Sequence, residues 1–372
     1  MAGLGRFVTA AGAGLALVVA SSGSADAAGT DVMTFGQDSF GQLGNGTAGA
    51  SPTPRTVLTG AGDVAGGREH ALALASGAVW AWGADDKGQV GDGAGLVNRT
   101  SPVRVVTSGA QAVTTGHYHS MALMTNGSVR AWGWNTKGQI GPSSALKVLS
   151  PAAVALPGTA TQVAAGRAHS LALVGGSVYS WGDNTFGQLG RTPSTAKNPT
   201  PQKVAGLPSI RFIAGGRDTS FAISTTGALY AWGNNSYGQA GTGAASSPTP
   251  RLVGSGFTHV ESGADHTIAR KSDGTVWTWG RNRYGQLGYA GGNRATPTRV
   301  TALSGITKVF AGRDHSIAIA SNGSVSTWGR NDGGQLGVSS TTVSQRSTPT
   351  VVSSLAGAVD AGGGQVFSIV LR

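Results

Sequence analysis

The sequence predicts an all-β protein, a seven-bladed β-propeller whose blades are four-stranded antiparallel sheets. Three observations carry this prediction: a repeat with a period of about 50 residues, strand-type alternation inside each repeat, and two chain ends that complete one another. Helical periodicity is absent from the repeats.

The repeat is marked by a Gly-Gln-x-Gly turn. Self-similarity at a period of about 50 residues is typical of propellers, solenoids and arrays. The turn occurs seven times, with its glutamine at Gln42, Gln89, Gln139, Gln188, Gln239, Gln286 and Gln335.

Each repeat is predicted to be a meander of short strands. Val163–Ala165 is rich in small residues, whereas Ser170–Leu173 and Val178–Trp181 alternate as half-buried strands do, with a tight reversal between them at Gly175-Gly176. Other copies carry Asn-Gly or Asp-Gly at this point, which predicts a two-residue hairpin turn with positive φ at both central residues. These pairs are Asn126-Gly127, Asp273-Gly274 and Asn322-Gly323.

Proline marks a fourth strand in every copy. Because proline cannot donate a hydrogen bond to a β-ladder, it belongs on an edge strand. The proline-marked strand is therefore predicted to be outermost in each blade, and the Ala/Gly-rich strand innermost. The prolines are Pro54, Pro102, Pro151, Pro201, Pro250, Pro297 and Pro349.

The two ends of the chain are predicted to share one blade. Val32–Phe35 aligns with the third strand of a repeat, and Ala358–Ala361 and Val366–Leu371 align with the first and second strands. Pairing these segments closes the ring and removes the exposed sheet edge of an open array. A linear solenoid is the alternative, but it requires capping repeats.

These motifs resemble the regulator of chromosome condensation repeat family, whose members are seven-bladed propellers. The resemblance rests on A-G-x-x-H-S, W-G-x-N and G-Q-L-G and covers about residues 31–372. Phe35 in place of Trp, Thr219 in place of His, and an expanded Gly362–Phe367 segment depart from the pattern. Name-giving members are nuclear guanine-nucleotide exchange factors, and similar exported bacterial propellers inhibit β-lactamases.

Residues 1–27 are predicted to be a secretory signal peptide, followed by a single propeller domain over residues 28–372. Arg6 precedes the apolar run Phe7–Ala20, and Ala25-Asp26-Ala27 matches a small-residue cleavage site. We therefore expect a secreted or cell-envelope protein of bacterial type, with no membrane span in the mature chain. A retained N-terminal anchor is the alternative.

Composition narrows the chemistry and the partners. The chain has no cysteine, which excludes disulfides and thiol chemistry, and its net charge is +11. That charge favours an anionic partner, either an acidic protein or a cell-wall polymer. Nucleic acid is not expected, since no Lys/Arg run of nuclear-localisation type occurs.

No catalytic residue, metal ligand or cofactor site is predicted. The recurrent His-Ser pairs, such as His119-Ser120, do not suggest catalysis, because neighbouring side chains on a strand point to opposite faces. We expect them to serve in packing or hydrogen bonding. Six tryptophans at one repeat position are predicted to be core wedges between blades: Trp82, Trp132, Trp181, Trp232, Trp279 and Trp328.

One face of the ring is predicted to bind a partner. The loops between strands one and two and between strands three and four emerge on the same side, and they carry arginines and aromatic residues, the side chains enriched in interface hot spots. Trp134 is predicted to enter a loop. The predicted partner-binding face is Arg68, His117, Tyr118, Trp134, Arg167, Arg217, Asp265 and Arg313.

The sequence therefore favours an exported, non-catalytic, monomeric module that binds a protein through this face, with enzyme inhibition as one form of that function. Two alternatives stay open. The first is a protein similar to the guanine-nucleotide exchange factors, and the second is an envelope-associated binder of an anionic polymer.

Overall fold

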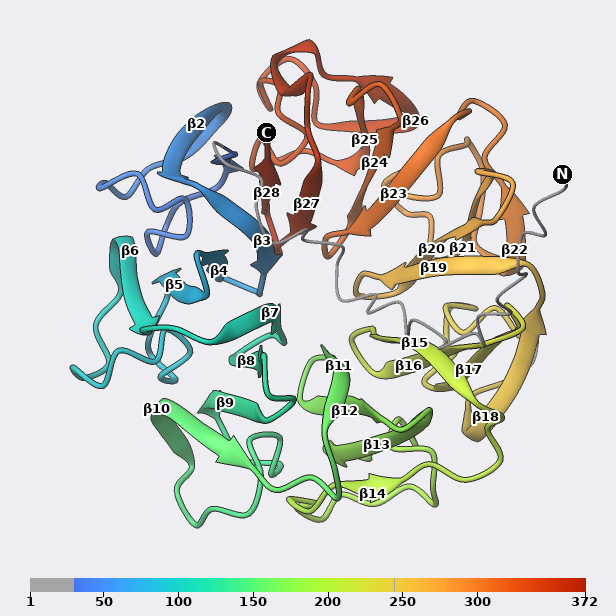
Figure 1. Cartoon of the computed structure of the whole chain (residues 1–372). Helices are drawn as coiled ribbons and strands as arrows, with labels where there is room; N and C mark the ends of the chain where they lie inside the picture. Colours follow the sequence, from blue (N-terminus) through green and yellow to red (C-terminus); the bar gives the residue numbers. More distant parts are fainter. Residues whose placement is uncertain (1–29, 244) are drawn as a thin grey trace, which may run out of the picture.

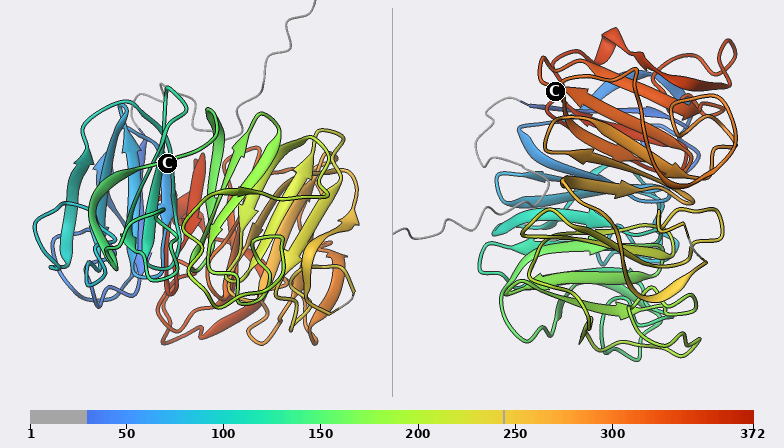
Figure 2. Two further views of the ribbon diagram at one scale, coloured as in Figure 1. Left: turned by 90° about the horizontal axis from the view of Figure 1, so that it is seen from below. Right: turned by 90° about the vertical axis from the view of Figure 1, so that its right-hand side faces the viewer.

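The computed structural model describes residues 30–243 and 245–372, so the predicted signal peptide lies outside the described residues. Seven four-stranded antiparallel sheets form a closed ring around a central axis (Figure 1). The sheets stack side by side around that axis (Figure 2). Among the described residues the sole helical element is a 3-10 turn, Ser353–Leu355, and no helix is long and apolar enough to cross a membrane.

The two chain ends share one blade, as predicted. Its strands are ordered β2-β1-β28-β27, so β28 from the C-terminus lies between two partners (Figure 1). Val32 of β1 pairs with Leu371 of β28, and Met33 pairs with Val370. The bounds are β1 (Asp31–Gly36), β2 (Ser51–Thr59), β27 (Asp360–Gly363) and β28 (Phe367–Leu371).

The other six blades are consecutive meanders, each running from the axis to the rim in chain order. The first three are β3 (Ala61–Gly66), β4 (His70–Ala75), β5 (Ala78–Gly83) and β6 (Arg99–Val106); β7 (Ala110–Thr115), β8 (His119–Met124), β9 (Val129–Trp134) and β10 (Lys147–Val154); and β11 (Ala160–Ala165), β12 (His169–Val174), β13 (Ser177–Gly182) and β14 (Gln202–Lys203). The next three are β15 (Ile210–Gly215), β16 (Thr219–Ser224), β17 (Leu229–Gly233) and β18 (Ser247–Gly254); β19 (Phe257–Ser262), β20 (His266–Lys271), β21 (Val276–Gly280) and β22 (Arg294–Arg299); and β23 (Ile306–Ala311), β24 (His315–Ala320), β25 (Val325–Arg330) and β26 (Gln345–Val351).

The proline-marked strands are outermost, and the small-residue strands are innermost, as predicted (Figure 1). Six of the seven repeat prolines lie inside these outer strands, where a missing N–H costs no ladder bond on the solvent side. Pro201 is the exception, because it directly precedes β14, which is only two residues long.

The prediction for the hairpin turns is right for Gly175-Gly176 and wrong for the Asn-Gly and Asp-Gly pairs. Both Gly175 and Gly176 have positive φ, whereas in the other three pairs only the glycine does. The reason is loop length. The Met124 N–H bonds to the Ser128 carbonyl, which leaves three residues in that loop rather than two. A three-residue hairpin needs one left-handed residue at its end, which Gly127 supplies.

Tryptophans fill the interfaces between blades, as predicted. All six repeat tryptophans are completely buried. The Trp132 indole N–H donates to the carbonyl of Gln89 in the preceding blade at 3.0 Å, and the same bond recurs from Trp181 to Gln139 at 2.9 Å. Each Gly-Gln-x-Gly turn therefore anchors the next blade through its backbone carbonyl.

The histidines and serines of the His-Ser pairs form hydrogen bonds, as expected, and the structure shows that these bonds join neighbouring blades. The His119 Nε2 lies 3.0 Å from the Oγ of Ser170 in the next blade, and that hydroxyl donates to the Gln139 carbonyl at 2.9 Å. Because the hydroxyl proton is used on the carbonyl, Nε2 must donate to Oγ. Burial lowers the pKa of His119 to about 3, which keeps the imidazole neutral. The same arrangement recurs at His70, His169, His266 and His315.

Two interfaces lack this bond, and at both of them the donor and the acceptor change together. At the blade that joins the chain ends, Phe367 takes the histidine position and Ala71 takes the serine position in the next blade, and both lie in one buried apolar cluster. At the second interface, Thr219 takes the histidine position and its hydroxyl donates to the Asn234 carbonyl. Thr267 takes the serine position in the following blade, and its hydroxyl donates to the Gln239 carbonyl. No buried polar group is thus left facing an apolar partner.

Candidate functional site

A ring of loops surrounds the axis on one face of the propeller. These loops join the first and second strands of each blade, and each bonds to the next through the backbone. The Arg68 N–H donates to the His117 carbonyl, and His117 donates in turn to Arg167. In the remaining bonds the backbone N–H of the first residue donates to the carbonyl of the second, at 2.9 to 3.3 Å. These pairs are Arg167 to Arg217, Arg217 to Gly263, Ala264 to Arg313, Arg313 to Gly364, and Gln365 back to Arg68. The loop backbone is therefore preorganised around the whole circumference.

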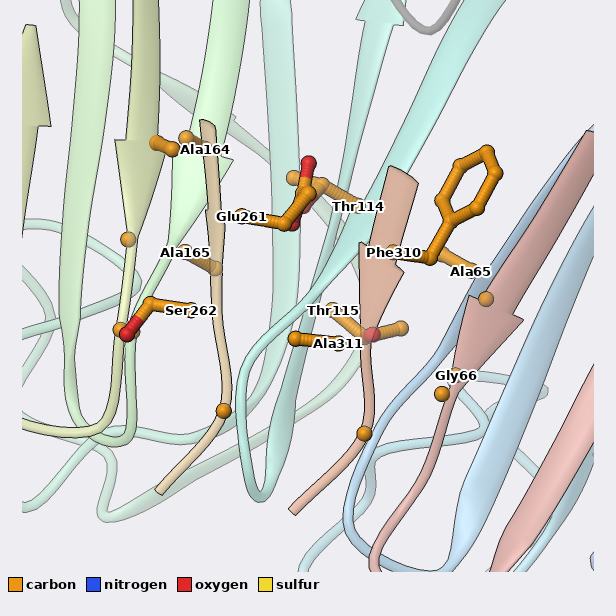
Figure 3. A pocket seen from close by; sticks show the side chains of 18 of the residues that line it. Ala65, Gly66, Thr114, Thr115, Ala164, Ala165, Glu261, Ser262, Phe310 and Ala311 are labelled. Carbon is orange, nitrogen blue, oxygen red and sulfur yellow. The ribbon is translucent and has the colours of Figure 1, made fainter. Parts of the chain in front are cut away.

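Behind this ring lies a central channel of about 470 Å³. Its wall is made by the inner strands, and the side chains near the face are mostly short, such as Ala65, Ala164 and Ala311, with Glu261 and Phe310 as the larger ones (Figure 3). Inner strands of small residues let seven blades approach a common axis, which explains the Ala/Gly-rich sequence.

In front of the ring lies a second cavity of about 340 Å³, which we call the mouth cavity. It contains seven of the eight residues that the sequence predicts for the partner-binding face, brought together from five blades and the loops between their strands. They are Arg68, His117, Tyr118, Trp134, Arg167, Arg217 and Arg313. Five of these also line the channel, so the two cavities adjoin one another at the loop ring.

Asp265 is the predicted residue that does not line the mouth cavity. Its carboxylate is buried and lies 3.2 Å from Arg281. Asp265 is thus a buried counter-ion of Arg281, which lies further from the axis.

The arginines of the mouth cavity are half-exposed and are backed by buried carboxylates. Arg167 donates from Nε to Asp218 at 2.9 Å, and its Nη2 lies 3.4 Å from Asp183. Arg217 lies 3.6 Å from Asp218, and Arg313 lies 3.5 Å from its neighbour Asp314. The acids orient the guanidinium groups from behind, and the positive charge faces outward.

His117 sits among these arginines. Burial and the surrounding positive charges of Arg167, Arg217, Arg68 and Arg313 lower the pKa of His117 to about 3. The imidazole is therefore neutral at physiological pH. It adds a hydrogen-bonding surface to the cavity without adding charge.

Two aromatic residues form one wall of the mouth cavity. Tyr118 and Trp134 meet edge to face with their ring centroids 5.3 Å apart, and the Arg68 guanidinium lies 5.1 Å from the Tyr118 ring centroid. The prediction that Trp134 enters a loop is wrong, because it is the last residue of β9 and pairs with Lys147 of β10. Continuing the ladder for one more residue holds this indole in a fixed position at the cavity edge.

Further from the axis, the aromatic residue before the Gly-Gln turn is exposed in several blades. Phe40, Phe186 and Tyr237 are each 39% exposed. Their backbone N–H groups donate to the side-chain oxygen of the glutamine two residues later, at 2.8 to 2.9 Å. Each exposed aromatic is thus held on a fixed turn, and together they widen the apolar part of this face.

Sequence reasoning missed Lys137, Asp183 and Gln365, which also line the mouth cavity. Lys137 lies 3.7 Å from Asp183 and takes a repeat position that is Phe or Tyr in four copies and lysine in one other, Lys87. A departure from the repeat at that position was the available signal. Within the described residues no cluster of three or more potential metal-ligating side chains occurs.

The fold and this face define a seven-bladed propeller that carries a preformed loop platform on one side. The chain belongs to the RCC1-like domain family, which matches residues 31–370 and confirms the resemblance seen in the repeats.

Two solved structures share this fold over almost the whole chain. Prp20p from Saccharomyces cerevisiae has a TM-score of 0.85 and 24% identity, and the match covers 93% of this chain and 92% of that one. Human WBSCR16 has a TM-score of 0.82 and 24% identity, with 92% and 98% covered.

A curated relative matches a shorter stretch. The probable E3 ubiquitin-protein ligase HERC6 of Homo sapiens is 32% identical over 221 residues, which is 56% of this chain but only 16% of HERC6. The chain thus spans far less than two thirds of that relative's length.

Proposed function

We propose that this protein is an exported, non-catalytic module that binds another protein through the face around the mouth cavity. The observation that carries the proposal is the mouth cavity itself, where arginines and aromatic residues from separate blades converge on a hydrogen-bonded loop ring. A rigid, preorganised platform loses little conformational entropy on docking. Inhibition of an enzyme by covering its active site is one form that such binding takes.

Export rests on the N-terminal sequence, where residues 1–27 have the features of a signal peptide. The absence of catalysis rests on the His-Ser pairs. Each histidine meets a serine that already donates to a backbone carbonyl in a fully buried interface, so neither group is available to a substrate. The ligase activity of HERC6 is not carried over, because the matched stretch is 16% of that protein.

Relatives support protein binding as the general use of this fold. The structure of Prp20p is described with its binding properties to Gsp1p and histones, and a second structure shows Kap60 bound to yeast RCC1. These likenesses show the fold alone, so the choice of face for this chain rests on its own residues.

Replacing Tyr118 and Trp134 by alanine should weaken partner binding by on the order of 2 kcal/mol for each residue, as expected for aromatic hot spots. Both side chains are half-buried at the cavity edge, so the thermal midpoint should change little. The partner is first captured from secreted and envelope fractions of the host with mature protein as bait. Its affinity for each variant is then measured by calorimetry.

The matched control is Pro157→Ala with Thr159→Ala, which changes an exposed loop on the opposite face. It should leave the affinity unchanged. If the control variant loses binding while Tyr118→Ala with Trp134→Ala keeps it, the choice of face is wrong.

Nucleotide exchange is a second candidate, favoured only by the likeness to Prp20p. An exported protein meets no cytosolic GTPase, so we expect no acceleration of GDP release from a Ran-type GTPase when the mature protein is added. Accelerated release would replace the proposed function with exchange activity.

Attachment to an anionic wall polymer is a third candidate, favoured by the net charge of +11. Such attachment is electrostatic and should weaken as salt shortens the screening length to about 3 Å at 1 M. Fractionation of cells at low and high ionic strength tests it, and retention that does not respond to salt excludes an electrostatic attachment.

A further inference from the structure

The four arginines of the mouth cavity present positive charge to solvent, while the aspartates that pair with three of them are buried. Side chains of Arg68, Arg167, Arg217 and Arg313 are 34 to 40% exposed, whereas those of Asp183, Asp218 and Asp314 are 3 to 7% exposed. An approaching molecule therefore meets guanidinium groups first, and the carboxylates lie behind them.

Three of these guanidinium groups have unused hydrogen-bond donors. Among the residues that the structure describes, the side chains of Arg68, Arg217 and Arg313 donate no hydrogen bond, and their nearest carboxylates lie 3.5 to 3.6 Å away. A guanidinium carries five N–H donors in a planar fork. The neighbouring acids, Glu69, Asp218 and Asp314, thus lie close to these groups without using their donors.

The four positive charges converge on one place. They all act on His117, whose pKa they lower together with burial, so the field at the centre of the cavity is positive. Lys137 adds a fifth cation at the cavity edge. The mouth cavity therefore has the charge and the donor geometry for an anionic group.

A carboxylate suits these donors best. A planar guanidinium fork matches a carboxylate with two parallel N–H···O bonds, which strengthens the contact and fixes its orientation. The aromatic wall of Tyr118 and Trp134 adds apolar contact beside the arginines, which suits a peptide segment rather than a free ion. At about 340 Å³ the cavity is at the small end of ligand sites.

We propose that the mouth cavity is a carboxylate-binding site that receives a protruding acidic segment, carrying Asp or Glu side chains, of the protein partner. This inference rests on the proposed function and names the chemistry of the partner at the site. Arg217 and Arg313 bind the carboxylates, Arg68 supports them, and Arg167 stays committed to its two buried aspartates.

The test uses fluorescein-labelled hexaglutamate as the probe, with hexaglutamine as the uncharged reference and anisotropy as the readout. Arg217→Gln with Arg313→Gln should weaken hexaglutamate binding at least tenfold. The fold tolerates this change, because Asp218 keeps Arg167 as a partner and Asp314 keeps Arg330 at 3.5 Å. The thermal midpoint of the variant checks that it is folded.

The matched control is Arg55→Gln with Arg104→Gln, which removes the same charge from two exposed outer-strand positions. It should weaken binding less than twofold. Arg217→Lys with Arg313→Lys keeps the charge but loses the planar fork, so an intermediate loss is expected. Equal losses in the mouth and control variants would overturn the site, since binding would then follow net charge alone.

Inorganic polyphosphate is the competing anion. If it binds through Arg217 and Arg313 more tightly than hexaglutamate does, the assignment to a carboxylate segment is wrong. The peptide titration needs no partner, so it is independent of the capture experiment. Loss of peptide binding together with unchanged partner capture by the mouth variant would retain an anion site but refute its role in recognition.

Discussion

Acidification from pH 7 to pH 4 should unfold this propeller cooperatively, because five fully buried histidines are neutral in the folded state. Burial lowers the pKa of His70, His119 and His315 to about 3, and that of His169 and His266 to about 4. The unfolded chain has an ordinary histidine pKa of about 6.5. Between these values the unfolded state binds more protons, so stability falls as the pH falls.

The expected effect is large. A depression of about 3 pKa units corresponds to roughly 4 kcal/mol for one group, and five groups together exceed the 5 to 15 kcal/mol that typically holds a domain folded. Protonation would place a second N–H on Nδ1, which has no hydrogen-bond partner among the described residues. The raised pKa values of Asp38 and Asp85, both about 6, act in the opposite direction, as do the raised pKa values of Glu69, Asp218 and Asp360. His117, whose pKa is lowered to about 3, adds a sixth histidine to the destabilising groups.

Circular dichroism against pH measures this transition, and the chain supplies its own matched variant. His70→Phe with Ser120→Ala copies the natural pairing of Phe367 with Ala71 at the blade that joins the chain ends. Gln89 keeps the Trp132 indole as a donor, so its carbonyl stays bonded. We expect the acid midpoint of this variant to shift to lower pH. An unchanged acid midpoint would show that these histidines do not control acid stability.

Deletion of Val366–Arg372 should lower the thermal midpoint sharply or prevent folding. The deletion removes β28, which lies between β1 and β27, and it takes away Phe367, Ile369, Val370 and Leu371, all of them buried. Burial of each such side chain contributes about 1.5 to 3 kcal/mol. The deletion also leaves β1 with an unpaired edge and opens the ring.

Calorimetry of the truncated chain checks this, and a pair of substitutions separates burial from chain length. Val370→Ala truncates a completely buried side chain in β28. Val359→Ala truncates a side chain that is 48% exposed, directly before β27. The first should lower the midpoint and the second should not. A truncated chain as stable as the full one would be incompatible with closure of the ring by β28.

The architecture could be predicted from the sequence because the same contacts recur in every blade and leave the same residues at each repeat position. The spacing of the glutamines, the prolines and the complementary ends each follow from a local rule applied seven times. Details that depend on one residue of strand length were not predictable in this way. Asn126-Gly127 looks like a two-residue turn until the Met124 to Ser128 bond is known, and Trp134 looks like a loop residue until its pairing with Lys147 is known.

The candidate site was predictable in position but not in chemistry. The repeat placed Arg68, Arg167, Arg217 and Arg313 at one loop position, and the topology then brought them to one mouth. The ion pair between Arg167 and Asp218 crosses a blade boundary, and no local pattern marks which acid will back which arginine. Asp265 shows the consequence, since it takes the loop position of Asp218 and Asp314, one residue after that of the arginines, and is buried against Arg281.

Hydrogen exchange of a chain that starts at residue 28, with and without its captured partner, tests the central claim most directly. We predict slower exchange in the loops that form the mouth, namely residues 67–69, 116–118, 166–168, 216–218 and 312–314, together with residues 134–137. The loops of the opposite face, such as residues 155–159 and 205–209, should exchange at the same rate in both states. Protection confined to those opposite-face loops would contradict recognition through the mouth cavity.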